Sequence, residues 1–537
     1  MYEIGLFGLA FLARFFHLRL FPVTHDEAAW TFGSLNNFDK FMGIPVACFH
    51  GYIQPFFSYL VFFTNKVFIS PEFILRVPAV IIGSATVTMV YILGKEMYGR
   101  KTGLFSSFLL CLLPWHVIQS RVGVSVILTP FFGCLIFLSL FKAINKKNNL
   151  WFFLSWFFLG VGAFYTYQNS LLFIPIFLAT LLFLRKELHW LKFNIFILSI
   201  IVFLIIVYPL IHLQITGQIP EYFGKVYGMY YNYDNFKVSL SDLLFKSFVN
   251  FRGNIFESFK GLFFTEYSFQ FGKALHYPAL INFLSLLIIV LSIALSLYYR
   301  KAADKIILIW LVLGYIGSIS GVRLHDVRYI IIVLPVFLIL MGRFIAEIFN
   351  RMPKKVSFRR VTLFFLGVSL FLTLAFSEIS QLTKYYLSAP ADLEECRMNS
   401  YGCKETALYL SKIPGIEAHR IVSDAWMEPL FVYLNYYLPN KKIISGFNRE
   451  LNMTRQELRE EIYYLVWAPE SHPQDYREGM YGWLWKNVQM QYPKLSPVHT
   501  VYYPNGYPAI YIFKVKLTLH ASLNKEIPIQ ASVLNRF

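Results

Sequence analysis

Repeated apolar segments of membrane length constrain this chain more than any other feature. A helix that crosses a bilayer needs about 20 predominantly apolar residues. Hydrophobic residues make up 56% of the 537 positions and charged residues only 15%, which indicates an integral membrane protein. We expect eleven spans, near residues 4–21, 73–93, 103–119, 124–141, 150–167, 170–184, 194–213, 278–299, 305–320, 329–345 and 361–377.

The segment 55–69 is apolar but shorter, and could be either a further span or a helix along the membrane surface. If it does not cross, the Lys and Arg residues of the short loops fall almost entirely on one side, which the positive-inside rule makes cytoplasmic. We therefore expect a juxtamembrane helix at 55–69 and a cytoplasmic N-terminus. Three longer segments then face the exterior: 22–72, 214–277 and the tail from 378.

The net charge of +18 does not predict a nucleic-acid partner, because the cations cluster in short loops between apolar runs. That pattern indicates topology and contact with anionic lipid headgroups. The first apolar stretch is not followed by a small-residue cleavage signal, so we expect it to remain as a helix. The localisation that follows is the plasma membrane or a bacterial inner membrane.

The tail changes character and predicts a separate small α/β domain, residues 378–537, beside a transmembrane domain of residues 1–377. Helical and strand-like stretches alternate in it, as expected for such a domain. Cys396 and Cys403 could form a disulfide outside the cytosol or remain separate. We expect helices at 404–412 and 429–437, and strands at 420–424, 462–467 and 509–515.

Asp26 and Glu27 follow the first span directly, at the exterior membrane face. Thr24 or Asp26 could cap the helix that follows, with acids favoured in its first turn. A capping role does not exclude chemistry, because a rigid support is how a general base is held against the group that it activates. We predict Asp26 and Glu27 as catalytic residues.

A second polar cluster precedes the segment 55–69. Pro55 fits the first position of a helix, and His50 and Gln54 lie just before it, at the same face as Asp26. We expect His50 and Gln54 to bind substrate or lipid phosphate. Asp26, Glu27 and His50 could instead hold a divalent cation, although no ligand spacing here is diagnostic.

A third cluster runs from Arg323 to Tyr329 in a short exterior loop, on the side that should be poor in Arg. An arginine pair presented to a phosphate explains this, because guanidinium binds phosphate bidentately. A loop closed by a salt bridge through Asp326 is the alternative. We predict a phosphate site that contains the other exterior cation and four residues of this loop, namely Arg121, Arg323, His325, Arg328 and Tyr329.

Polar and aromatic residues also gather between the fifth and sixth spans. Tyr165 and Gln168 could belong to an interfacial aromatic belt or could contact a sugar. If these residues contact a sugar, we predict that His25, Tyr165 and Gln168 bind the sugar or the acceptor.

These pieces, in this order, resemble the membrane glycosyltransferases of GT-C fold that use polyprenyl-phosphate sugars, especially the protein O-mannosyltransferases and aminoarabinose transferases. The similarity extends to about residue 345, although 140–320 matches only in hydropathy. No Lys adjoins Gln54-Pro55, which weakens the case for lipid A as acceptor. The matching stretches are His25–Ala28, His50–Pro55, Arg76–Pro78, Gly94–Gly103, Pro114–His116, Ser120–Arg121 and Arg328–Tyr329 leading to Pro335.

The resemblance implies a polytopic GT-C-like helical protein with juxtamembrane helices in its first outer loop. It implies an inverting transfer of a sugar from a polyprenyl-monophosphate donor to a protein, lipid or glycan acceptor, with Asp26 at the catalytic centre. Two other functions stay open. A transporter or flippase would carry ionisable residues near the middle of its spans, and a glycan ligase would use a diphosphate-linked donor.

Overall fold

A computed structural model describes most of the membrane region and the ordered parts of the tail. The described residues are 2–28, 55–216, 240–263, 283–320, 327–351, 358–388, 400–416, 419–423, 427–438, 444–446, 461–471, 485, 488–489 and 492–516.

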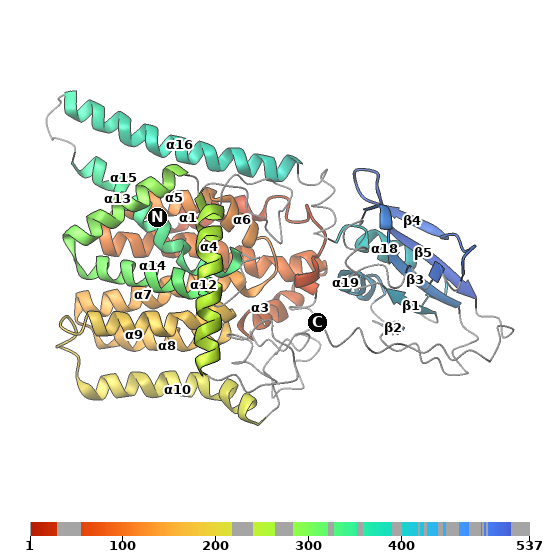
Figure 1. Cartoon of the computed structure of the whole chain (residues 1–537), viewed down its shortest axis with the longest axis horizontal. Helices are drawn as coiled ribbons and strands as arrows, with labels where there is room; N and C mark the ends of the chain where they lie inside the picture. Colours follow the sequence, from red (N-terminus) through yellow and green to blue (C-terminus); the bar gives the residue numbers. More distant parts are fainter. Residues whose placement is uncertain are drawn as a thin grey trace.

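Helices form the whole of the described membrane region, and most of them run roughly parallel as a bundle (Figure 1). The sequence explains this, because in the bilayer only helices satisfy the backbone within one segment. The helices are α1 (Tyr2–Phe15), α3 (Pro55–Asn65), α4 (Pro71–Tyr98), α5 (Arg100–Leu112), α6 (Pro114–Gln119), α7 (Leu128–Lys146), α8 (Asn149–Tyr165), α9 (Phe173–Phe183), α10 (Phe193–Ile215), α12 (Leu240–Phe263), α13 (Phe283–Tyr299), α14 (Ala302–Ser320), α15 (Leu334–Asn350) and α16 (Phe358–Ser388). Short 3-10 turns precede α7, α9 and α15: η3 (Ser125–Ile127), η4 (Gln168–Leu172) and η6 (Val327–Val333).

Every segment predicted as a span is largely helical over its described residues, but not every helix has the length of a span. Six helical segments of the described residues are long and apolar enough to cross a membrane: Pro71–Tyr98, Ser125–Lys146, Phe193–Leu213, Ala302–Ser320, Arg328–Asn350 and Phe358–Leu387. Three shorter apolar helical segments accompany them, Asn149–Tyr165, Gln168–Phe183 and Phe283–Tyr299. The protein is therefore an integral membrane protein, and the count of eleven spans stays a prediction.

Helix α4 is packed closely against α5, and two glycines make this possible. A Cβ added at Gly103 would lie 2.5 Å from the backbone oxygen of Tyr91, and one at Gly94 would lie 3.1 Å from the Cα of Gly103. Small residues at helix interfaces allow such close approach in membranes. The pair accounts for the first and last of the three glycines of the predicted loop motif Gly94–Gly103; the other, Gly99, has a φ of 99° between α4 and α5.

Helix α12 lies within the segment 214–277, which we predicted only as an exterior loop. It runs across the direction of the bundle helices (Figure 1) and meets the C-terminal end of α14. The side-chain amides of Asn250 and Asn254 donate to the carbonyls of Ser320 and Ile319, at 3.4 and 2.9 Å. These carbonyls end α14 and have no partner within the helix, so α12 caps α14.

The tail forms an α/β domain at one end of the bundle (Figure 1), as predicted. Its five-stranded sheet has the order β2-β1-β3-β5-β4, with β1 parallel to β2 and β3, and β5 antiparallel to β3 and β4. The elements are α18 (Cys403–Ser411), β1 (Arg420–Ser423), α19 (Glu428–Tyr437), β2 (Ile444–Gly446), β3 (Glu461–Trp467), β4 (His499–Tyr502) and β5 (Pro508–Lys516). The five predicted elements are confirmed, whereas the short strands β2 and β4 were missed.

Helix α16 continues to Ser388, past the predicted domain boundary at residues 377 and 378. Cys403 is buried at the start of α18. Cys396 lies outside the described residues, so the disulfide stays untested. We call the end of the bundle that contacts the α/β domain the docked end; it contains the start of α4, where Glu72 contacts Lys404 and Tyr433.

Candidate active site at the docked end

The chain leaves α1 and turns into a short helical segment that begins at Thr24. The amide of Glu27 donates to Oγ1 of Thr24 at 3.3 Å, and the amide of Thr24 donates to Oε2 of Glu27 at 2.8 Å. These reciprocal bonds form a capping box, which satisfies two amides that a helix start leaves unpaired. Thr24 is therefore the cap, and Asp26 lies in the first turn that the box holds in place.

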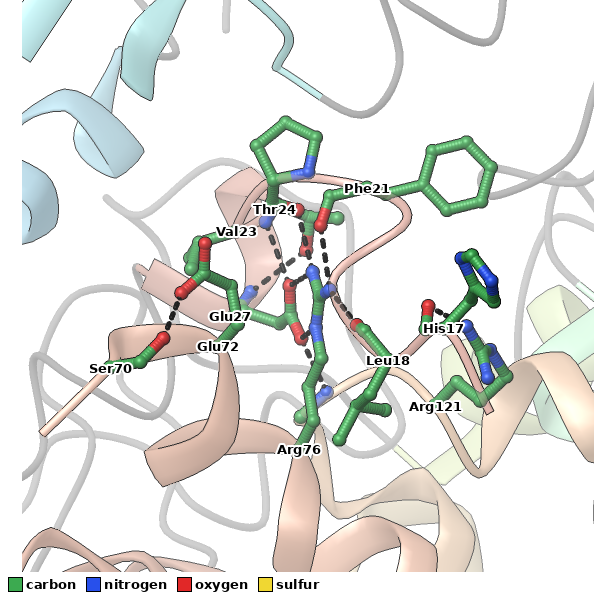
Figure 2. Close-up of polar contacts among 12 residues, drawn as sticks. His17, Leu18, Phe21, Val23, Thr24, Glu27, Ser70, Glu72, Arg76 and Arg121 are labelled. Atoms are coloured by element: carbon green, nitrogen blue, oxygen red, sulfur yellow. Dashed lines mark hydrogen bonds and ion pairs between the residues drawn. The ribbon is translucent and has the colours of Figure 1, made fainter. Parts of the chain in front are cut away.

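The Glu27 carboxylate is fully enclosed by protein donors (Figure 2). Arg76 donates to both of its oxygens, from Nε at 2.7 Å and from Nη2 at 2.8 Å, and the amide of Gly123 donates to Oε1 at 2.7 Å. Arg76 also donates to three carbonyls of the chain after α1: Leu18 at 2.9 Å, Phe21 at 2.7 Å and Pro22 at 2.5 Å. Glu27 and Arg76 thus fasten this chain segment to α4.

Asp26, the neighbour of Glu27, has a different environment. Nη1 of Arg328 lies 2.5 Å from its Oδ2, which joins residues 302 positions apart in the sequence. Both residues are buried, with 6% of Asp26 and 9% of Arg328 exposed. Within the described part of the chain this is the one polar contact of the Asp26 carboxylate. The structure therefore brings together the predicted base and one predicted phosphate-binding arginine.

Tyr329 and Gln168 also meet, from η6 and η4. The Gln168 side-chain amide donates to the Tyr329 hydroxyl at 2.8 Å, and the Asn169 amide donates to the Tyr329 carbonyl, also at 2.8 Å. Tyr167 stacks on the Tyr329 ring with centroids 5.9 Å apart. Oε1 of Gln168 is buried and has no hydrogen-bond partner among the described residues. Gln168 contacts Tyr329, which follows Arg328 in the sequence. A buried acceptor here, with no partner among the described residues, suits a polar ligand.

Arg121 is directed toward backbone carbonyls. Its guanidinium donates to the carbonyls of Arg14 at 2.7 Å, of His17 at 2.6 Å and of Phe16, and to the Tyr386 hydroxyl at 3.1 Å (Figure 2 shows the His17 contact). These carbonyls lie at and just beyond the end of α1, where cations are favoured. The contacts favour a role for Arg121 in ending α1 rather than in binding phosphate.

Arg14 makes the same kind of contact with α5. Its guanidinium donates to the carbonyls of Leu110 at 3.3 Å and Cys111 at 3.4 Å, and contacts Nδ1 of His116 at 2.8 Å. Pro114 has no amide proton to donate to the Leu110 carbonyl, so Arg14 supplies the missing donor. The Pro114-Trp115-His116 motif therefore marks a helix break that a buried arginine satisfies.

The remaining predicted site residues are distributed as follows. His25 is half-buried beside Asp26, and the Tyr165 hydroxyl donates to the Ile206 carbonyl at 2.7 Å, within the helix bundle. Among the described residues, no group of three His, Cys, Asp or Glu side chains could hold a metal ion. Four of the predicted residues lie outside the described residues: His50, Gln54, Arg323 and His325.

Comparison with known proteins adds a family and a fold. Residues 50–212 match the family of dolichyl-phosphate-mannose-protein mannosyltransferases. The fold resembles that of ArnT from Cupriavidus metallidurans, crystallised with undecaprenyl phosphate, with a TM-score of 0.58 and 11% identity over 96% of this chain and 98% of that chain. No curated protein matches the sequence significantly.

A second similar structure is the archaeal oligosaccharyltransferase AglB from Archaeoglobus fulgidus, in complex with an inhibitory peptide and a dolichol-phosphate. Its TM-score is 0.54, with 12% identity over 98% of this chain and 75% of that chain. At these identities the likeness shows the fold. Residues 50–212 thus resemble the mannosyltransferase family, and the chain has a fold similar to that of ArnT and AglB.

Proposed function

We propose that the protein is an inverting glycosyltransferase that moves a sugar from a polyprenyl-monophosphate donor to an acceptor at the docked end of the bundle, on the extracytoplasmic face. The observation that carries the proposal is the buried contact between Asp26 and Arg328. It pairs a carboxylate able to accept a proton with a guanidinium able to bind a phosphate.

The proposed reaction is a direct displacement at the anomeric carbon. The acceptor hydroxyl or amine attacks this carbon, and its proton passes to the Asp26 carboxylate. The bond from the anomeric carbon to the phosphate oxygen breaks, and the electron pair leaves with the lipid phosphate. Arg328 stabilises the charge that develops on the leaving oxygen, and attack from the opposite face inverts the sugar.

The ion pair also suggests how donor binding prepares the base. The Arg328 guanidinium contacts Asp26. A phosphate that binds Arg328 bidentately competes for the same N–H groups, and so releases the Asp26 carboxylate to the acceptor. Glu27 then acts as a positioning residue, since its oxygens are held by Arg76 and by backbone amides.

Other predicted residues complete the proposal. Arg323 and His325 precede Arg328 in the same loop and remain predicted phosphate contacts, as do His50 and Gln54 ahead of α3. The unused oxygen of Gln168 suits a sugar hydroxyl. A metal site formed by Asp26 and His50 remains open, whereas the Glu27 oxygens are already engaged by donors.

The donor class is supported by the relatives. The ArnT structure contains undecaprenyl phosphate, and the AglB structure contains a dolichol-phosphate and an inhibitory peptide, so both proteins bind a polyprenyl phosphate. We propose the same class of lipid for this chain, with a protein, lipid or glycan as acceptor.

The test is transfer by the purified protein in lipid vesicles. We expect labelled sugar to pass from a polyprenyl-monophosphate donor to an acceptor mixture, with inversion of the anomeric configuration measured by NMR. Transfer only from a diphosphate donor would indicate the ligase function. Movement of donor across sealed vesicles without any acceptor, and without transfer, would indicate a flippase.

A further inference from the structure

One tyrosine of the α/β domain contacts two segments of the membrane bundle at the docked end. Tyr433 lies on α19 and is fully buried. Its hydroxyl donates to Oε1 of Glu72 at 3.1 Å and accepts from the amide of Val23 at 2.8 Å. One side chain thus joins the domain to two segments, 410 and 361 residues away in sequence.

Both of these segments hold the candidate active site. Val23 immediately precedes Thr24, whose capping box orients the turn that carries Asp26. Glu72 lies one helical turn before Arg76 in α4, and Arg76 binds Glu27. Tyr433 therefore contacts the chain just before the Asp26 turn and the helix that fastens this turn, and Figure 2 shows Val23, Glu72 and Arg76 around Glu27.

The Tyr433 hydroxyl is suited to a permanent contact. Burial, and then the charge of Glu72, hold the pKa of Tyr433 well above its usual range, so the hydroxyl keeps its proton. Lys404 of α18 contacts the same Oε1 of Glu72 at 2.6 Å, and the Tyr401 hydroxyl donates to the Leu20 carbonyl at 2.6 Å. The domain is thus attached by several polar contacts, of which only the Tyr433 contact reaches Val23.

We propose that Tyr433 is a positioning residue, through which the α/β domain holds the Asp26 turn in its catalytic geometry. The proposal rests on the role proposed above for Asp26. The alternative is that Tyr433 only helps to dock the domain. The two interpretations differ because Lys404 also docks the domain on Glu72 but does not touch Val23.

The experiment compares three variants of the full chain in lipid. Tyr433→Phe removes the hydroxyl, and we expect kcat to fall about tenfold, the factor for one hydrogen bond to a charged group, with donor KM unchanged. Lys404→Met weakens docking alone and should leave kcat within about twofold, because the Val23 contact remains. Tyr436→Phe, a matched change on the half-exposed face of α19, should have no effect.

Hydrogen exchange gives a readout that is independent of catalysis. We expect faster exchange of the Val23 amide in Tyr433→Phe and not in Lys404→Met, since only the first loses the acceptor. Val23→Pro removes the same hydrogen bond from the other side and should lower kcat similarly, which keeps the test valid if Tyr433→Phe folds poorly.

Two kinetic results would overturn the proposal: unchanged kcat in Tyr433→Phe, or an equal loss of kcat in Lys404→Met. The exchange result stands even if Asp26 is not the base. Full activity of Asp26→Asn would therefore refute the proposed mechanism, and a slow Val23 amide in Tyr433→Phe would refute the positioning role.

Discussion

Two buried aspartate–arginine pairs lie at opposite ends of the membrane bundle and differ in how fully the protein surrounds them. Asp26 and Arg328 meet at the docked end, and Asp304 and Arg343 meet near Tyr98, at the other end of α4. Each pair has an N–O distance of 2.5 Å.

In the pair of Asp304 and Arg343, both oxygens of Asp304 accept hydrogen bonds. Oδ1 accepts from Arg343 and from the Tyr98 hydroxyl at 3.0 Å, and Oδ2 accepts from the Lys301 amide at 2.9 Å. Arg343 also donates to the Ser296 hydroxyl at 2.5 Å and lies over the Tyr98 ring. This network joins α4, α13, α14 and α15, and such complete satisfaction indicates a structural role.

At the docked pair, Arg328 alone of the described residues contacts the Asp26 carboxylate. A carboxylate with one oxygen that no described residue contacts can accept a proton from a ligand, whereas both oxygens of Asp304 already accept from protein donors. The comparison teaches that burial and an arginine partner do not distinguish a catalytic aspartate from a structural one. We propose that the number of protein donors on the carboxylate makes this distinction.

The largest effect is expected from Asp26→Asn. If Asp26 is the general base, kcat should fall about 10³-fold, within the range for removal of such a group. Arg328 loses its counter-charge, but stability should fall less than in Asp304→Asn, because the asparagine oxygen can still accept from Arg328 while its amide group turns toward the side where the described residues offer no contact. Transfer kinetics and thermal unfolding of the same preparation measure both, and retained activity would contradict the assignment.

Asp304→Asn should have the opposite profile. An asparagine there directs an amide group at Arg343, Tyr98 or the Lys301 amide, all of them donors, and leaves a buried arginine without its counter-charge. We expect a loss of about 3 kcal/mol of unfolding free energy. The folded fraction should keep the wild-type kcat, so equal stability losses in Asp26→Asn and Asp304→Asn would remove the distinction between the two pairs.

Hydropathy was sufficient for much of this fold and for part of the site. Long apolar runs predicted the helices, and the positive-inside rule put Asp26 and Arg328 on one face, where the structure pairs them. The S/T-x-x-E pattern of Thr24 and Glu27 was present in the sequence and predicts the capping box.

Other features depend on contacts between distant segments, which one sequence does not reveal. The bond from Arg76 to Glu27 and the Arg121 contacts with the end of α1 are of this kind. Helix α12 was missed because Phe alternates there with charged and polar residues, so its mean hydropathy is low. Strands β2 and β4 are too short to have a pattern.

The smallest effect at the pair of Asp26 and Arg328 is expected from Arg328→Ala. This change tests whether the pair acts on substrates or only stabilises the fold. Loss of one donor to a developing oxyanion costs about 10²-fold. Because Arg328 is also proposed to bind the phosphate of the intact donor, we expect the loss in kcat/KM for the donor, partly as a raised donor KM, with the acceptor KM unchanged. Asp26→Asn should instead lower kcat at saturating donor. Asp304 and Arg343 hold four helices together. If Asp26 and Arg328 had only such a structural role, Asp26→Asn and Arg328→Ala would both lower stability and would give the same kinetic profile. Two different kinetic profiles, with stability retained, would mean that each residue acts on a different substrate.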